Sequence, residues 1–411
     1  MKITVHHPNQ IGGCVTEIKS SKGTKIIIDV GSNLPGNDNE PLDIKGLTDG
    51  CAAVFVSHYH GDHIGDFDKV PPGIDIYTGK VTKDIFKTLH KTLEKIGKGK
   101  PECVEKFKTF PIGRPLSLPG KRGDMKITPL MVDHSAFDAY MFLIECDDKR
   151  ILYTGDFRMH GQRGCTLPEM LEKYAPEIDL LIIEGTMLSR NVKDVQTEHQ
   201  LGIDAKKLMD DNKNVFVWCS STNIDSIAEF YRATTPGRPF IADCFQEKVL
   251  RIVEKQRRSD LYDFSKRKIY SYSDNNKKLN DWMDEKGFCM LIRPNKYSTT
   301  CIEKLLNRFP DNLIIYSMWE GYLEEGKPYT DQFKIDFLKR AKSNGSRYEY
   351  LHTSGHATEE AICIVCEVTN AKKIFPIHSD RAEKFKELEK AGLIKGNVLD
   401  NTKTIKSGID F

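Results

Sequence analysis

The chain has 411 residues, of which 39% are hydrophobic and 29% charged, and its formal net charge at neutral pH is +2. This composition excludes a largely disordered chain. The length of the chain is typical of roughly two or three domains. No apolar run approaches the ~18 residues of a membrane span, and the N-terminus lacks the apolar region of a signal peptide, so we expect a cytoplasmic protein. The eleven cysteines are scattered singly, which indicates reduced thiols rather than a disulfide framework.

The first half of the chain contains five short apolar, β-branched runs that we predict to be strands. Each run ends at polar residues, which are Asp29, the cluster at 57–66, His134, Asp156 and Glu184. Functional groups often follow buried strands, because a rigid sheet then positions the loop that carries them. Five such endings favour a shared functional site.

The cluster SHYHGDHIGD, residues 57–66, concentrates metal-binding side chains at His58, His60, Asp62 and His63. If the first two histidines lie on a strand, their side chains point to the same side, and the following glycine lets the other two turn back towards them. Neutral imidazole and carboxylate groups suit Zn²⁺. Burying so many polar groups without partners is costly, so the cluster predicts a metal site.

Residues 82–98, TKDIFKTLHKTLEKIGK, have the periodicity of an amphipathic helix. Lysines recur at every fourth position of this segment, at Lys83, Lys87, Lys91 and Lys95. Such a basic face could attract a phosphate backbone, but the alternative, a solvated helix face, is favoured because acidic residues elsewhere balance the charge.

Three further ligand candidates, His134, Asp156 and His378, each follow a predicted strand. Together with the cluster they make seven ligands, enough for two metals roughly 3.5–4 Å apart that share one carboxylate. From sequence context alone, His134 and Asp156 could also be ordinary buried polar residues.

From about residue 190 to residue 350, predicted strands and helices alternate, which is typical of a parallel α/β sheet. We therefore predict a first domain at 1–188 and 352–411 with an inserted α/β domain at 189–351. The lone C-x-x-C of Cys363 and Cys366 lies among apolar residues at helical spacing, and we interpret it as part of a buried helix face.

The cluster, preceded by Asp29 and followed by His134 and Asp156, resembles the metallo-β-lactamase superfamily. That resemblance implies an α/β fold, an αββα sandwich with two metals at one edge. It implies that His58, His60 and His134 bind one zinc, that Asp62 and His63 bind the other, and that Asp156 bridges them. Asp29 would then orient the metal-binding loop.

Three later motifs resemble those of the β-CASP branch, and of ribonuclease J-type enzymes in particular. These motifs are IIEGT with Glu184, HTSGHA with His356 and PIHSD with His378. The resemblance implies a β-CASP-like inserted domain and places His378 at the second metal. It implies that Glu184 orients His356 near the leaving group, although each residue could instead cap a local turn or helix.

By this resemblance the protein is a nuclease, a two-metal phosphodiesterase that acts on RNA or single-stranded nucleic acid by attack of a metal-bridged hydroxide. Its cofactors would be two zinc ions, with manganese as an alternative, and its catalytic residues Asp62, Glu184 and His356. Ser220, Ser221 and Ser354 are candidates for phosphate binding, since backbone N–H groups at a strand-to-helix turn can hold a phosphate. Helix capping explains Ser220 and Ser221 equally well.

Two departures from ribonuclease J-type enzymes favour alternatives. Residues 316–325, YSMWEGYLEE, replace the usual phosphate-gripping loop, and the chain ends soon after the last motif, so we expect no further C-terminal domain. A dinuclear zinc hydrolase of a small ester, lactone or phosphodiester is therefore the second hypothesis. A non-catalytic nucleic-acid-binding protein is the third.

Overall fold

The computed structural model describes residues 1–37, 39–118, 124–190, 195–256, 259–309, 311–401 and the backbone of 409–410. The chain divides into two compact units, one formed by Met1–Asp194 with Gly355–Phe411 and the other by Val195–Ser354. Among the described residues, no helix is both long and apolar enough to cross a membrane.

The first unit contains two sheets, each with seven strands among the described residues. One sheet has, in spatial order, β20 (Ile409–Asp410), β1 (Lys2–His6), β2 (Val15–Lys19), β3 (Lys25–Ile28), β4 (Ala53–Phe55), β5 (Asp75–Thr78) and β6 (Lys108–Thr109). The pairs from β20 to β3 are antiparallel, and those from β3 to β6 are parallel.

The second sheet has, in spatial order, β19 (Asn397–Val398), β18 (Lys373–Ile377), β11 (Leu180–Glu184), β10 (Lys149–Tyr153), β9 (Ala139–Cys146), β8 (Met125–Val132) and β7 (Leu116–Ser117). Its β7–β10 half is antiparallel, and its β10–β19 half is parallel. In the register of β11 with β18, Glu184 pairs with Ile377, so the two strands end side by side.

A continuous apolar core joins the facing sides of these two sheets. Ile26 and Phe55 from the first sheet belong to the same buried cluster as Phe142 and Ile151 from the second. Across this core the rings of Phe55 and Phe142 meet edge to face, with centroids 5.8 Å apart. Burial of these large apolar side chains is the main force that holds the sheets together.

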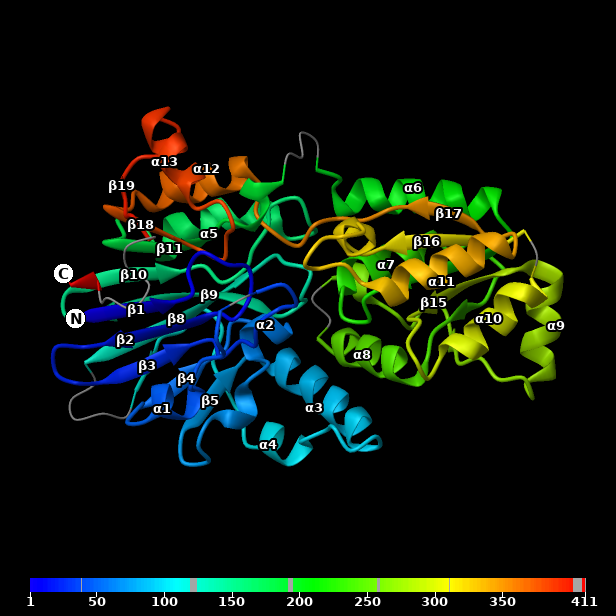
Figure 1. The fold of residues 1–411 in the computed structure, drawn as a ribbon, viewed down its shortest axis with the longest axis horizontal. Helices are drawn as coiled ribbons and strands as arrows, with labels where there is room; N and C mark the ends of the chain where they lie inside the picture. The colour runs from blue at the N-terminus through cyan, green and yellow to red at the C-terminus, as the bar shows by residue number, and fades with distance from the viewer. Residues whose placement is uncertain are drawn as a thin grey trace. The chain divides into compact units, whose positions relative to one another are not determined.

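Helices cover the outer sides of both sheets (Figure 1). The outer face of the second sheet packs against α5 (Leu167–Tyr174), α12 (Glu359–Thr369) and α13 (Glu383–Lys390). Because side chains alternate along a strand, Ile27 and Val54 point to the opposite face from the shared core. On that side lie α1 (Ile44–Thr48), α3 (Lys80–Glu94) and α4 (Pro101–Glu105), while α2 (Gly61–Ile64) lies at the strand ends. The first unit thus has a mixed α/β, helix–sheet–sheet–helix order, consistent with the sandwich that the resemblance implies.

The second unit is built around one parallel sheet, which confirms the prediction from strand–helix alternation. Its strands are, in spatial order, β14 (Ile269–Tyr270), β13 (Phe240–Ile241), β15 (Phe288–Ile292), β12 (Asn214–Cys219), β16 (Leu313–Ser317) and β17 (Arg347–Tyr350). Its helices are α6 (Glu198–Asp211), α7 (Ile224–Ala233), α8 (Cys244–Glu254), α9 (Lys277–Lys286), α10 (Thr299–Arg308) and α11 (Gln332–Ser343). The identity of this unit as a β-CASP domain stays a prediction.

Candidate metal centre

The predicted strand endings are confirmed, and they converge in the first unit. Asp29 directly follows β3, Glu184 ends β11, and His378 directly follows β18. His134 and Asp156 lie two and three residues beyond β8 and β10. Because parallel strands end at the same edge of a sheet, polar residues far apart in sequence meet there.

The histidine cluster lies in a loop rather than on a strand, which corrects the expected basis of its geometry. Strand β4 ends at Phe55, and His60 immediately precedes the short helix α2. Asp62 and His63 lie within that helical turn. The turn, not strand alternation, therefore brings the four side chains of the cluster together.

Three ring nitrogens form the first group of ligand atoms. His60 Nδ1 lies 3.0 Å from His58 Nε2 and 3.1 Å from His134 Nε2. Asp156 Oδ2 lies 3.8 Å from both of these Nε2 atoms. Tetrahedral zinc with Zn–N bonds of about 2.0–2.1 Å separates its nitrogens by about 3.3 Å. The spacing of this group fits a cation of that size.

A second group surrounds Asp62, His63 and His378. His378 Nε2 lies 3.2 Å from Asp62 Oδ2, and His63 Nε2 lies 3.9 Å from the same oxygen. His63 Nε2 is also 3.3 Å from Asp156 Oδ2, the oxygen that faces the first group. Asp156 therefore lies between the two groups, in the position of a shared ligand.

The carboxylate of Asp156 tests whether these residues fit a cation. The residue is 2% exposed, yet neither of its oxygens accepts a hydrogen bond. A buried carboxylate without such partners is costly, and a cation between the two histidine groups removes that cost. The donor set and the condition of Asp156 thus agree with metal binding.

Buried hydrogen bonds fix the orientation of the histidine rings. Asp29 accepts hydrogen bonds from His63 Nδ1 at 2.8 Å, from Tyr153 Oη at 2.8 Å and from Ser57 N and Oγ at 2.7 and 2.9 Å. A ring whose Nδ1 donates in this way keeps the lone pair of Nε2 for a metal. These contacts suit the orienting role that the resemblance implies for Asp29, and that role stays a prediction.

His134 and His378 are oriented in the same manner. His134 Nδ1 donates to the backbone oxygen of Gly355 at 2.5 Å, and His378 Nδ1 lies 2.8 Å from Thr186 Oγ1. Asp29 and His378 both have positive φ, of 61° and 50°. Such conformations cost energy in residues other than glycine, and they occur here beside the ligand groups.

Burial and neighbouring imidazoles lower the pKa values of the three histidines in the first group. Burial lowers the pKa of His58 and His134 well below the ordinary range, and neighbouring imidazoles add to this effect. Burial likewise lowers the pKa of His60 to about 4. These three rings are therefore neutral at pH 7 and keep their lone pairs for binding.

The second group has the opposite electrostatic character. Burial opposes charge on His63 and His378, but nearby anionic groups, Asp156 foremost, outweigh it and raise the pKa of both rings well above the ordinary range. Burial also opposes charge on Asp62, but His63 and His378 outweigh it and lower the pKa of this carboxyl group. The anionic groups around these two rings therefore favour positive charge at this position, which without a metal is carried by protons on the imidazoles.

Glu184 and His356 form a pair beside the ligand groups, as their predicted roles require. His356 Nδ1 lies 3.1 Å from Glu184 Oε2 and 3.6 Å from Asp156 Oδ2. Glu184 is fully buried and accepts hydrogen bonds from the backbone N–H groups of Phe157 and Ala357. The carboxylate is thereby fixed, and it can orient His356.

Cys14 is a residue near the site that the sequence interpretation missed. It is 9% exposed, and its Sγ lies 3.8 Å from His63 Nε2. Ligand atoms of Cys14, His63 and His378 all lie within 4.8 Å of one another. The available signal was the glycine pair at 12–13, which suits a close approach of the backbone at Cys14.

The three serine candidates belong to the second unit, and their role stays a prediction. Ser220 is exposed and follows β12, and Ser221 is 8% exposed with an Oγ that makes no hydrogen bond. Ser354 is the last residue of this unit.

The predicted lysine face on α3 is partly engaged within the first unit. Lys83 donates a hydrogen bond to the backbone oxygen of Glu105, and Lys87 forms an ion pair with the carboxylate of Glu105.

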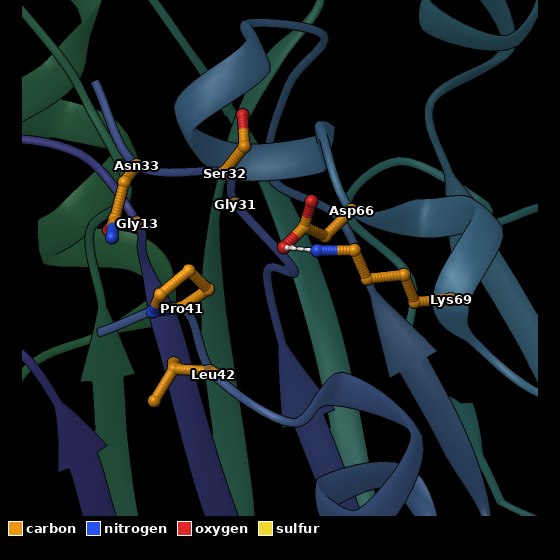
Figure 2. A pocket seen from close by; sticks show the side chains of 8 residues that line it. All are labelled: Gly13, Gly31, Ser32, Asn33, Pro41, Leu42, Asp66 and Lys69. Carbon is orange, nitrogen blue, oxygen red and sulfur yellow. Dashed lines mark hydrogen bonds and ion pairs between the residues drawn. The ribbon is translucent and has the colours of Figure 1, made fainter. Parts of the chain in front are cut away.

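A separate small pocket lies beside the backbone of the metal-binding loop. Figure 2 shows its lining, which is Gly13, Gly31, Ser32, Asn33, Pro41, Leu42, Asp66 and Lys69. Lys69 and Asp66 form an ion pair of 2.8 Å there. Its volume of about 140 Å³ is below the range of about 300–1,000 Å³ typical of small-molecule sites, so it does not explain substrate binding.

Comparisons with known proteins agree with this geometry. Residues 24–210 match the family described as the beta-lactamase superfamily domain. The chain is also similar to a crystal structure of a protein of unknown function from Enterococcus faecalis V583, with 19% identity and a TM-score of 0.73 over 99% of both chains. That likeness supports the fold alone.

Residues 24–210 thus carry a beta-lactamase superfamily domain. Of His58, His60, Asp62, His63, His134, Asp156 and His378, this range contains all except His378. The domain and its clustered histidines and aspartates indicate a metal-dependent hydrolase.

Proposed function

We propose that the protein is a two-metal phosphodiesterase that acts on RNA or single-stranded nucleic acid and that its second unit is a β-CASP-like domain. The observation that carries this proposal is the Glu184–His356 pair beside Asp156. A hydrolase of phosphodiesters must protonate a departing sugar oxygen, and an imidazole held by a buried carboxylate suits that task. His356 lies within 3.6 Å of the shared ligand Asp156, close enough to serve the same reaction.

The residues of the two groups would hold the cations. His58, His60 and His134 would bind one and Asp62, His63 and His378 the other, with Asp156 shared. When bound, the two cations would supply a water that is activated near neutral pH and compensation for the charge that develops on the phosphoryl oxygens.

The chain's own residues would organise the rest of the reaction. Asp29 and the Gly355 carbonyl hold His63 and His134 in the tautomers that present Nε2 to the site. Glu184 Oε2 lies 3.1 Å from His356 Nδ1 and would orient the ring, so that the ring can donate a proton to the leaving oxygen. The products would have 5′-phosphate and 3′-hydroxyl ends.

A cleavage panel tests this function directly. Zinc-loaded protein is incubated with 5′-phosphorylated and 5′-hydroxyl RNA and DNA, and the ends of the products are identified. We expect cleavage by the unaltered protein and by His199→Ala, a control at an exposed histidine of α6. His60→Ala and His356→Ala should each lose at least about 100-fold in rate. Absence of cleavage in the panel, or full activity of His60→Ala, contradicts the proposal.

A second function, hydrolysis of a small phosphodiester, ester or lactone, is favoured by the weak positive charge of the chain. The net charge is +2, and Lys83 and Lys87 already interact with Glu105, the last residue of α4. Competition distinguishes the two functions. If RNA strongly inhibits turnover of a chromogenic phosphodiester, nucleic acid is the substrate class, whereas turnover that RNA does not affect supports the small molecule.

A further inference from the structure

Cys14 places a sulfur atom at the edge of the second ligand group. Its Sγ lies 3.8 Å from His63 Nε2, and His378 completes a set of ligand atoms within 4.8 Å. In a tetrahedral site, a Zn–S bond of about 2.3 Å and a Zn–N bond of about 2.0 Å separate sulfur and nitrogen by about 3.5 Å. The observed distance is close to that of two ligands on one cation.

The backbone of Cys14 is fixed to the metal-binding loop. Its N–H donates to the carbonyl oxygen of Asp62 at 3.0 Å, and its own carbonyl accepts from Gly31 N at 3.0 Å. Gly12 and Gly13 before it have φ of 91° and 67°, conformations that other residues rarely adopt. The main chain therefore holds Cys14 beside the loop that carries His63.

An independent feature points to a cation at the same place. The buried Asp156 accepts no hydrogen bond at either oxygen, and its Oδ2 lies 3.3 Å from His63 Nε2, the nitrogen that is 3.8 Å from Cys14 Sγ. His63 Nε2 thus belongs to one group of ligand atoms with Cys14 and His378 and to another with His58 and Asp156.

We propose that Cys14 supplies a thiolate ligand to the cation held by His63 and His378. The inference rests on the two-metal centre of the proposed function and makes its two positions chemically unequal. The first position offers nitrogen and oxygen ligands only, while the second also offers sulfur. The thiol proton leaves to solvent when the metal binds. A thiolate favours soft or borderline cations such as Zn²⁺ over Mn²⁺ or Mg²⁺ at the second position.

Several other buried or partly buried cysteines are poor competitors for metal. Burial raises the pKa of Cys219, Cys289 and Cys366 to about 12 and that of Cys51 to about 11. These side chains stay protonated near neutral pH, and thiols bind metals poorly. Within the described part of the chain, Cys14 is the cysteine that the metal-ligand groups include.

Cobalt substitution tests the proposal. Co²⁺ is titrated into metal-free protein, into Cys14→Ser and into Cys165→Ser, a control at an exposed cysteine. Thiolate ligation produces a charge-transfer band in the near ultraviolet that imidazole and carboxylate ligands do not. We expect the unaltered protein and Cys165→Ser to bind two equivalents and show the band. Cys14→Ser should lack the band and bind the second equivalent of Co²⁺ about 10–100-fold more weakly than the unaltered protein.

The outcomes separate this inference from the proposed function. Two equivalents of bound cobalt without the band, or a band that persists in Cys14→Ser, overturns the thiolate ligand and leaves the two-metal centre intact. Failure of the unaltered protein to bind cobalt overturns both.

X-ray absorption of the zinc-loaded, unaltered protein gives a measurement that does not depend on the folding of a variant. We expect a sulfur shell at about 2.3 Å that corresponds to one sulfur per two zinc ions. Nitrogen and oxygen scatterers alone, at about 2.0–2.1 Å, contradict the proposal.

Discussion

At the scale of single residues, Asp29 does more for the site than its sequence position suggests. One buried carboxylate accepts four hydrogen bonds, from His63 Nδ1, Tyr153 Oη and the N and Oγ of Ser57. It thereby joins β3, the metal-binding loop and β10. Its negative charge also supports the metal-binding tautomer of His63.

Replacing Asp29 by asparagine should therefore weaken metal binding without removing a ligand. Asparagine has one acceptor oxygen and no charge, so some of the four donors lose their partner. We expect Asp29→Asn to lower zinc affinity by about 10–100-fold, measured by competition with a chelating dye. The matched control is Asp124→Asn, which removes a carboxylate that accepts from Ser20 and Thr24. Equal affinities in both variants contradict the orienting role.

The sequence predicted the histidines and aspartates of this site but did not point to Cys14. His58, His60, Asp62 and His63 stand out because such a density of polar groups needs a shared partner. Cys14 lies 43 positions before Ser57 and among residues that suit a core strand, so composition alone gave no reason to select it. Its proposed role depends on a backbone contact with Asp62, and the local signal nearby, the glycine pair at 12–13, does not identify that contact.

At the scale of elements, the apolar runs predicted the strands and the place where each one ends. The runs before Asp29, His134, Asp156 and Glu184 are strands because β-branched, apolar residues suit a sheet buried on both faces. The loop at His58–His60 was wrongly placed on a strand, because alternating histidines resemble strand periodicity. In the structure β4 ends at Phe55 and α2 begins at Gly61, so the two histidines lie in the connection between them.

Gly31 shows how closely these elements approach each other. A Cβ atom at this position would lie 1.7 Å from the Asp62 carbonyl oxygen and 2.8 Å from Cys14 N. Both are backbone atoms and cannot move aside easily. The glycine therefore permits the contact that places the metal-binding loop beside β3 and Cys14.

We predict that Gly31→Ala destabilises the first unit by about 1–3 kcal/mol or more and also reduces the bound metal. Urea unfolding and metal analysis of the same preparation measure both effects. The matched control is Gly73→Ala, since a Cβ there meets nothing within 4 Å. That exposed change should stay within about 0.5 kcal/mol. A neutral Gly31→Ala with full metal content disproves the close approach.

At the scale of the whole molecule, sequence predicted the classes of structure but not their order in space. Strand–helix alternation indicated a parallel sheet in the second unit, and that is what forms. The order β14-β13-β15-β12-β16-β17 depends on long-range packing that a single sequence does not display. Likewise, the resemblance implied a sandwich, while the pairing of β1 with β20 near the C-terminal end was not foreseen.

The shared core of the first unit gives a stability prediction. Phe142 is fully buried and contacts Phe55 of the facing sheet and Phe110. Phe142→Ala should cost about 3–5 kcal/mol, because it removes apolar contacts and leaves a cavity between the sheets. Phe333→Ala, at a side chain that is 37% exposed, should change stability by about 0.5 kcal/mol or less.

Two spectroscopic signals show which unit loses stability in Phe142→Ala. All three tryptophans, Trp218, Trp282 and Trp319, lie in the second unit, so their fluorescence monitors that unit, whereas far-ultraviolet circular dichroism reports on both. We expect Phe142→Ala to lower the unfolding midpoint seen by circular dichroism. A midpoint unchanged from that of Phe333→Ala contradicts the two-sheet core.

The central claim is that one buried carboxylate, Asp156, joins two groups of ligands into one centre for two cations. Metal content per chain, measured by mass spectrometry on the unaltered protein and on Asp156→Ala after dialysis against limiting zinc, tests it most directly. We predict two zinc ions per chain in the unaltered protein and fewer than one in Asp156→Ala. A metal-free unaltered protein, or two ions retained by Asp156→Ala, would contradict the account.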